Sequence, residues 1–113
     1  MAGCGSRQNG QHEEEEQAVF IVLLRFSSNK ARAAEFMDGH KAWIQKGFAD
    51  GVFAVVGSLR PEGGGAVLAH GIDREALEAR VNEDPFVAEK VVEAEIHEIA
   101  PSRMDERLDF LAA

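Results

Sequence analysis

The sequence predicts an α+β fold, a ferredoxin-like β-α-β-β-α-β domain with an antiparallel sheet. Three observations support it. Four segments with strand character and two with helix character follow one another in that order. Right-handed crossovers between them place both helices on one face of the sheet. The first strand is apolar on both of its faces, so the sheet face without helices is expected to be covered by a second subunit.

The first half of the domain is predicted from the composition of its segments and from the capping and turn residues between them. "AVFIVLLRF" (Ala18–Phe26) is β-branched and aromatic, which is typical of a strand. The amphipathic segment from Lys30 to Asp50 predicts a long helix. The Ser-Ser-Asn triplet before it offers N-cap residues, and Gly51 is expected to end the helix. Val52–Leu59 and Ala66–Ile72 are predicted strands, and the glycine-rich segment between them predicts a hairpin.

The second half repeats the alternation with weaker signals. Asp73 is a predicted cap for a helix from Arg74 to Glu83, and the Asp-Pro-Phe triplet at Asp84–Phe86 breaks that helix. Val91–Ile99 alternates apolar and polar residues, which predicts a strand with one buried face. Pro101 ends this last strand.

The chain divides into three predicted parts. Residues 1–17 are rich in Gly, Gln and Glu without an apolar period, so we expect a disordered polar and acidic tail. Residues 18–101 form the ferredoxin-like domain. Residues 102–113 are a C-terminal extension that we expect to form a short helix. One hypothesis gives this extension, from Arg103 to Leu111, a role in docking a partner.

The charge excludes some classes of partner. The formal net charge is -8, with four acidic residues in the run Glu13–Glu16. An acidic chain argues against nucleic acid or an anionic membrane as the main partner, because both select for clustered Lys and Arg. The single cysteine, Cys4, lies in the predicted tail, so we expect no disulfide in the fold and a cytoplasmic location.

His40 stands out on the first predicted helix. It lies on one stripe with Phe36, Trp43, Ile44 and Phe48, and that stripe should face the core. One interpretation is a neutral core histidine that is hydrogen-bonded in place. The other is a general acid/base, which needs a neighbouring carboxylate to hold one ring nitrogen while the other faces a substrate. Trp43 fits either a core anchor or a pocket wall.

Asp84 is the best candidate for that carboxylate. Pro85 restricts its backbone and Phe86 can anchor the turn in the core. A common role for such a residue is a cap on the turn that follows, and that role is compatible with contact to His40.

Other signals of chemistry are missing from the sequence. The segment "PEGGG" lacks the Lys-Ser/Thr that follows in a phosphate-binding loop, and no Cys/His cluster has the spacing of a metal site. "VGSL" is not a nucleophile elbow, which argues against Ser58 as a nucleophile. We therefore expect neither a metal nor a cofactor.

Three polar residues on the strands are interpreted as structural. His70 and His97 suit wet strand ends or a subunit contact. Arg25 closes an apolar strand and suits an interface salt bridge with Glu93 or Glu95 better than an anion-binding role.

Taken together, the segments "FIVLLRF", "HKAWI", "GVFAVVGSL", "AVLAHG", "EDPFV" and "VVEAEIHEI" resemble the YciI-like, or YCII-related, family. The resemblance covers residues 19–101. Its most specific elements are His40 with Trp43 three residues later, and Asp84-Pro85-Phe86 after the second helix.

The resemblance implies a homodimeric α/β barrel in which two ferredoxin-like subunits pack sheet to sheet. It also implies a site in which His40 and Asp84 form a catalytic pair, with Trp43 and Phe86 beside them. Gly57 matches the family's glycine at the end of the second strand. The family commonly has proline next, whereas this chain has Ser58, which makes Ser58 a candidate substrate contact.

Two hypotheses of function follow. The resemblance implies a cofactor-independent enzyme with lyase, isomerase or dehalogenase-type chemistry on a small cyclic or aromatic molecule. The alternative is a non-catalytic homodimer that binds a small ligand or serves as an accessory domain, and the absence of a nucleophile or metal motif favours it.

Overall fold

The structure is a computed structural model that describes residues 18–112. Its sheet has four strands, β1 (Val19–Phe26), β2 (Phe53–Ser58), β3 (Gly65–His70) and β4 (Val92–Ile99), in the spatial order β2-β3-β1-β4. All neighbouring pairs are antiparallel. The predicted ferredoxin-like arrangement is confirmed for the subunit. The predicted tail, with Cys4 and Glu13–Glu16, lies outside the described residues.

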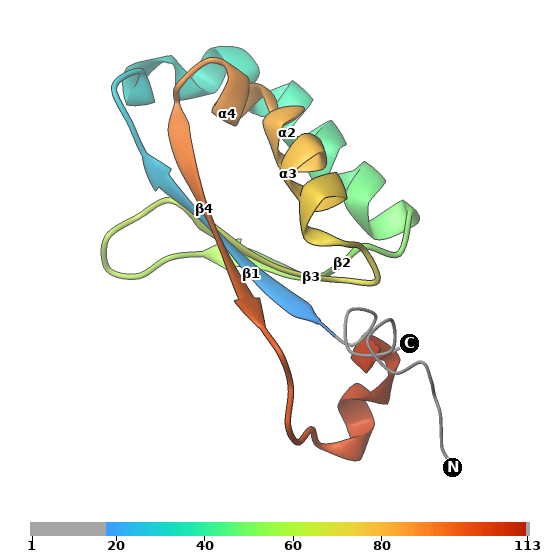
Figure 1. Cartoon of the computed structure of the whole chain (residues 1–113). Helices are drawn as coiled ribbons and strands as arrows, with labels where there is room; N and C mark the ends of the chain where they lie inside the picture. Colours follow the sequence, from blue (N-terminus) through green and yellow to red (C-terminus); the bar gives the residue numbers. More distant parts are fainter. Residues whose placement is uncertain (1–17, 113) are drawn as a thin grey trace.

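The helices lie together on one face of the sheet (Figure 1). They are α2 (Ala33–Ala49), α3 (Arg74–Asn82) and the single turn α4 (Pro85–Ala88). A short 3-10 turn, η1 (Lys30–Arg32), precedes α2, and a second one, η2 (Glu106–Ala112), follows β4. In Figure 1, η2 lies beyond the end of the sheet, away from the helix layer. No helix among residues 18–112 is long and apolar enough to cross a membrane.

The core lies between the sheet and the helices. Alternate residues of β1 point into it, and Phe20, Val22 and Leu24 are at most 3% exposed. The alternation of β1 leaves Ile21 and Leu23 on the open face, where both are half-buried. The inward face of β1 therefore packs against the helix layer.

The predicted capping of the first helix is wrong. None of the side chains of Ser27, Ser28 and Asn29 caps η1 or α2. Instead, Ser27 donates to Glu93, and the Asn29 side chain donates to the carbonyl of Glu89 at 2.8 Å. These groups connect the start of the helix to β4 and its approach, which are distant in sequence.

The predicted core stripe of the first helix is partly wrong. Phe48 is 45% exposed, although its ring meets that of Phe53 edge-on. Gly47 is buried in its place, because the Phe53 ring occupies the space where a side chain at position 47 would stand. By contrast, Asp73 caps α3 as predicted, accepting a hydrogen bond from the Ala76 amide at 2.7 Å.

Candidate active site

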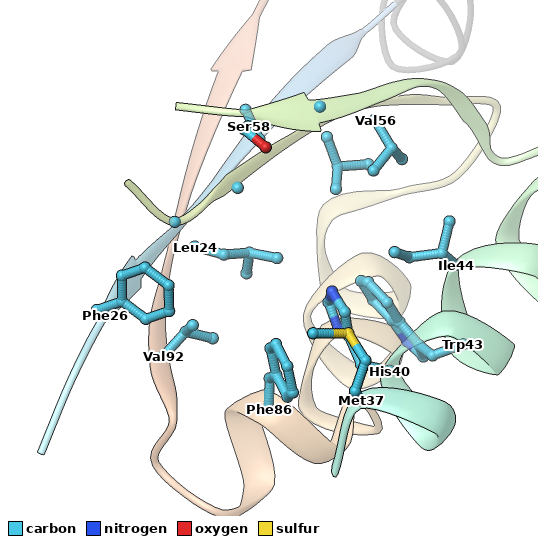
Figure 2. A pocket seen from close by; sticks show the side chains of 15 residues that line it. Leu24, Phe26, Met37, His40, Trp43, Ile44, Val56, Ser58, Phe86 and Val92 are labelled. Atoms are coloured by element: carbon cyan, nitrogen blue, oxygen red, sulfur yellow. The ribbon is translucent and has the colours of Figure 1, made fainter. Parts of the chain in front are cut away.

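A cavity of about 320 Å³ opens between the helices and one end of the sheet. The last residues of β1 and β2 and the first residues of β3 and β4 form one side of it, and α2 and α4 form the other. Figure 2 shows these side chains facing one another across the cavity. The lining residues are Leu24, Phe26, Met37, His40, Trp43, Ile44, Val56, Gly57, Ser58, Gly64, Gly65, Ala66, Val67, Phe86 and Val92.

His40 and Asp84 are in direct contact at the helix side of this cavity. His40 Nδ1 lies 2.8 Å from Asp84 Oδ1. The Asp84 side chain is 0% exposed, and that of His40 is 15% exposed. The imidazole is therefore partly exposed to the cavity, whereas the carboxylate is fully buried.

The local fold explains how Asp84 reaches this position. After α3 ends, Asp84 is extended and becomes the N-cap of α4, with Pro85 in the first turn. Its Oδ1 accepts a hydrogen bond from the Phe86 amide at 3.0 Å. The capping role and the contact with His40 thus use the same oxygen.

These contacts favour one tautomer of His40. Because Oδ1 is an acceptor, Nδ1 carries the proton when the ring is neutral, and the lone pair of Nε2 is left free. Asp84 Oδ2 is buried and has no hydrogen-bond partner within residues 18–112.

A glycine allows the two elements to approach. Gly39 precedes His40 on α2, and a Cβ added there would lie 2.9 Å from Pro85 Cγ. A larger residue would push α4 away from α2, so Gly39 sets the short His40–Asp84 distance. A glycine inside a helix costs about 1 kcal/mol relative to alanine, and this unfavourable placement is a signal that the sequence analysis missed.

Aromatic rings fix the orientation of the imidazole. His40 stacks on Phe86 with 4.0 Å between centroids and an interplanar angle of 3°. Trp43 lies 6.0 Å away at 20° on the same helix. The Trp43 indole donates to the Arg80 carbonyl at 2.8 Å and is 7% exposed, so it is both a core anchor and a cavity wall.

The strand side of the cavity holds the other two predicted residues. Gly57 and Ser58 line it at the end of β2. In Figure 2 the Ser58 hydroxyl points toward the cavity from the wall opposite His40. Five of the six candidate site residues thus line one cavity, and the sixth, Asp84, is buried behind His40.

Sequence reasoning missed most of the apolar wall. Leu24, Met37, Ile44 and Val56 line the cavity, but each also follows the ordinary pattern of a core position. No local signal distinguishes a side chain that faces a cavity from one that faces a filled core.

The three remaining polar residues lie away from the cavity. His70 is half-buried on the open face of the sheet, where its ring meets Phe110 edge-on at 5.6 Å. His97 is exposed on β4. Arg25 pairs with Glu95 at 3.2 Å within the chain, whereas the sequence analysis placed this salt bridge at an interface.

The arrangement suits proton transfer inside an apolar pocket. His40 is the one titratable side chain in its lining, and Asp84 holds one nitrogen of that ring. Within residues 18–112 there is no group of three His, Cys, Asp or Glu side chains placed to hold a metal ion.

Comparisons of sequence identify no relative. No protein-family profile matches the chain. No curated protein sequence matches it either.

Comparisons of structure find similar folds at low identity. One is 5-chloro-2-hydroxyhydroquinone dehydrochlorinase (TftG) from Burkholderia phenoliruptrix AC1100, solved in complex with 2,5-dihydroxybenzoquinone. It has a TM-score of 0.59 and 12% identity, over 79% of this chain and 97% of that one. Another is a conserved protein from Methanosarcina mazei Go1, with a TM-score of 0.49 and 19% identity over 80% of this chain and 99% of that one. At this identity the likeness to TftG is a likeness of fold.

Proposed function

We propose that the protein is an acid/base enzyme of the YciI-like kind that acts on a small cyclic or aromatic molecule. His40 would be the proton-transferring group and Asp84 the residue that orients it. The observation that carries this proposal is the 2.8 Å contact between a cavity-facing imidazole and a fully buried carboxylate. In a catalytic pair, such a contact would fix the tautomer of the histidine and stabilise its imidazolium form.

The proposed chemistry is an elimination or an isomerisation. Nε2 of His40 removes a proton from a carbon or hydroxyl of the substrate, and the electron pair left behind either expels a leaving group or shifts a double bond. In the second case the imidazolium returns the proton at another atom. The fold shared with TftG, whose name is that of a dehydrochlorinase, supports this class of reaction.

The other cavity residues would bind the substrate. Trp43 and Phe86 flank the imidazole and offer apolar contact to a ring. Gly57 presents main chain without a side chain, and Ser58 offers a hydroxyl on the opposite wall. We assign residues 18–101 to this ligand-binding domain and residues 102–113 to an extension of it.

We also propose a homodimer formed through the open face of the sheet. Ile21, Leu23 and Leu68 are apolar and half-buried there, and Val55 is 57% exposed. Large apolar surfaces of this kind usually mark an interface. The same face carries both Arg25 and Glu95, and a face with both signs can complement a second copy of itself.

A second candidate function is a non-catalytic protein that binds a small ligand. The composition of the cavity favours it, because His40 and Ser58 are the only lining residues with a hydrogen-bonding side chain apart from the Trp43 indole, which is already bonded. A site with so few polar side chains is as well suited to ligand binding as to catalysis.

Replacement of His40 distinguishes the two functions. The native protein is screened for turnover of halogenated hydroquinones, small lactones and cyclic enones. We expect His40→Gln to lower kcat by about 10²–10⁴-fold, because a well-placed general base contributes that much. Lys41→Gln, at an exposed position of α2 outside the cavity lining, is the control and should retain native turnover.

The two variants should keep the native circular-dichroism spectrum, so that a loss of rate reports chemistry. Full turnover in His40→Gln would reject the acid/base proposal. Ligand binding at the cavity without turnover across the screen would favour the binding protein.

A further inference from the structure

The walls of the cavity carry no formal charge. None of its fifteen lining residues is Asp, Glu, Lys or Arg. The nearest carboxylate in the described structure, Asp84, is 0% exposed behind His40. We propose that the cavity selects uncharged ligands and excludes carboxylates, phosphates and ammonium compounds of the same size. This inference rests on the cavity assigned above but does not require that the protein be an enzyme.

An anion in this cavity would lose its hydration without gaining a countercharge. Burying an ion away from water is unfavourable unless a partner of opposite charge or several hydrogen bonds replace the water. The side chains of the walls offer one imidazole and one hydroxyl to replace that water. The buried Asp84 carboxylate adds a repulsion that acts through a medium of low dielectric constant.

None of the cations near the lining residues in sequence is itself part of the lining. Lys41, next to His40, and Arg60, two residues after Ser58, are exposed and lie outside it. Lys30 Nζ lies over the Phe26 ring, 4.8 Å from its centroid, and is exposed. Arg32 pairs with Glu35 at 3.2 Å. Arg25 pairs with Glu95, which lies on the open face of the sheet. An anionic group inside the cavity therefore lacks the Lys or Arg that usually accompanies a carboxylate or phosphate.

A cationic ligand gains no direct partner either. Asp84 is the only buried charged side chain among the described residues, and access to it is closed by His40 and Phe86. Its Oδ1 already faces His40 Nδ1 and the Phe86 amide. An ammonium group would therefore lose hydration while remaining outside hydrogen-bond distance of the carboxylate.

The shape of the cavity limits the ligand further. A volume of about 320 Å³ has room for one ring or a fused pair. His40 and Ser58 lie on opposite walls with apolar side chains between them, as Figure 2 shows. The fitting ligand is a small neutral ring with a polar oxygen or nitrogen at each end.

Three probes of equal size test the charge selection. They are 4-hydroxybenzamide, which is neutral, 4-hydroxybenzoate, which is anionic, and tyramine, which is cationic at neutral pH. Binding is followed by NMR at the Trp43 indole N–H and the backbone amides of Gly57, Gly64 and Gly65, which line the cavity. The titrations are run at high salt, because the chain's net charge of -8 would otherwise repel anions at any surface.

We expect the amide to bind at least ~10-fold more tightly than either charged probe, since an unpaired buried charge costs more than the 1.4 kcal/mol that a factor of ten represents. Equal affinity for 4-hydroxybenzoate or tyramine would overturn the inference. The absence of shifts at all four reporters with every probe would overturn it together with the assignment of the cavity.

A lysine placed in the cavity should change the selection. Met37 lines the cavity on α2, whereas Gln45 on the same helix is exposed outside it. We expect Met37→Lys to raise the affinity for 4-hydroxybenzoate by ~10-fold or more, and Gln45→Lys, which adds the same charge, to leave it unchanged. An equal gain in both variants would show that net charge, not the cavity wall, sets the preference.

This outcome is separable from the test of the proposed enzyme. Selection of the neutral probe with unchanged turnover in His40→Gln would reject acid/base catalysis and keep the charge selection. Tight binding of 4-hydroxybenzoate with turnover that depends on His40 would reject the charge selection and keep acid/base catalysis.

Discussion

At the scale of single residues, Asp84 connects the fold with the proposed chemistry. It is a helix cap, a buried carboxylate and the partner of His40 at the same time. A capping role alone would be met by an exposed Ser or Asn. Burial of a full carboxylate is unfavourable without a compensating partner, and the imidazole of His40 is the partner that the structure supplies.

The sequence predicted this pair because both residues belong to short, ordered patterns. His40 precedes an aromatic residue by three positions, and Asp84 is followed by proline and an aromatic residue. Gly39 escaped prediction, because its importance depends on the approach of Pro85, which is 46 positions away in the chain and meets it only in the fold.

Asp50 provides a prediction of pH dependence at this scale. Its carboxylate accepts hydrogen bonds from Lys46 at 3.2 Å and pairs with Arg80 at 3.1 Å. These contacts, that of Lys46 first, hold the pKa of Asp50 below its usual value of 3.8. A lowered folded-state pKa means that the contribution to stability is complete above the unfolded pKa and is lost as the pH falls through the folded one.

We therefore expect Asp50→Asn to be less stable than the native protein at pH 7, with the difference shrinking as the pH falls below 3.8, the usual pKa of this carboxyl. Urea unfolding midpoints across this range measure the difference. Gln45→Asn, at an exposed and uncharged position of α2, is the control, and its difference from the native protein should not change with pH. A constant difference between native and Asp50→Asn at every pH would contradict the account.

At the scale of elements, α2 owes its position to close packing at two glycines. Gly39 leaves room for Pro85 of α4, and Gly47 leaves room for the Phe53 ring at the start of β2. The sequence pattern placed Phe48 in the core because it continues the apolar stripe of the helix. The structure buries Gly47 instead, since the shape of a neighbouring strand decides which face of the last turn is filled.

Gly47→Ala tests this packing. Alanine normally stabilises a helix interior by about 1 kcal/mol relative to glycine. Here a Cβ would lie within 2.1 Å of the Phe53 ring, which is 4% exposed. We expect a net loss of about 1–3 kcal/mol in the free energy of unfolding, as is typical of an overpacked core.

Ala42→Gly, at an exposed position of α2, is the matched control. It should lose about 1 kcal/mol through helix propensity alone. Urea denaturation of both variants gives the two values. A Gly47→Ala protein more stable than the native one would show that Phe53 moves aside at no cost.

The strands and their order were predictable because the periodicity of each strand is local. The start of α2 was not, because Ser27 and Asn29 use their side chains on partners more than fifty positions away. Local capping rules cannot anticipate a tertiary partner that competes for the same side chain.

At the scale of the whole molecule, the two faces of the sheet have different environments. Helices cover one face, and Phe20, Val22 and Leu24 are buried beneath them. The other retains Val55 at 57% and Ile99 at 45% exposure beside half-buried Ile21 and Leu23. The proposed homodimer would account for this difference between the faces. The apolar open face itself was predictable, because the first strand is apolar on both sides in the sequence.

Val55→Glu tests the dimer. A carboxylate at this position would have to be buried at the interface between the two sheets. We expect the native protein to sediment with twice the chain mass of 12.3 kDa, and Val55→Glu to sediment as a single chain. Gln45→Glu adds the same charge on an exposed part of α2 and should leave the dimer intact. A native protein that sediments at the mass of one chain at micromolar concentration would contradict the proposal.

The central claim is that Asp84 holds His40 with Nε2 free toward the cavity, and nitrogen NMR of the His40 ring tests it most directly. At a pH where the ring is neutral, the account predicts a proton on Nδ1 and a bare Nε2 in the native protein, and a shift toward the Nε2–H tautomer in Asp84→Ala. A proton on Nε2 in the native protein, unchanged by Asp84→Ala, would contradict it and leave His40 as a packed core residue.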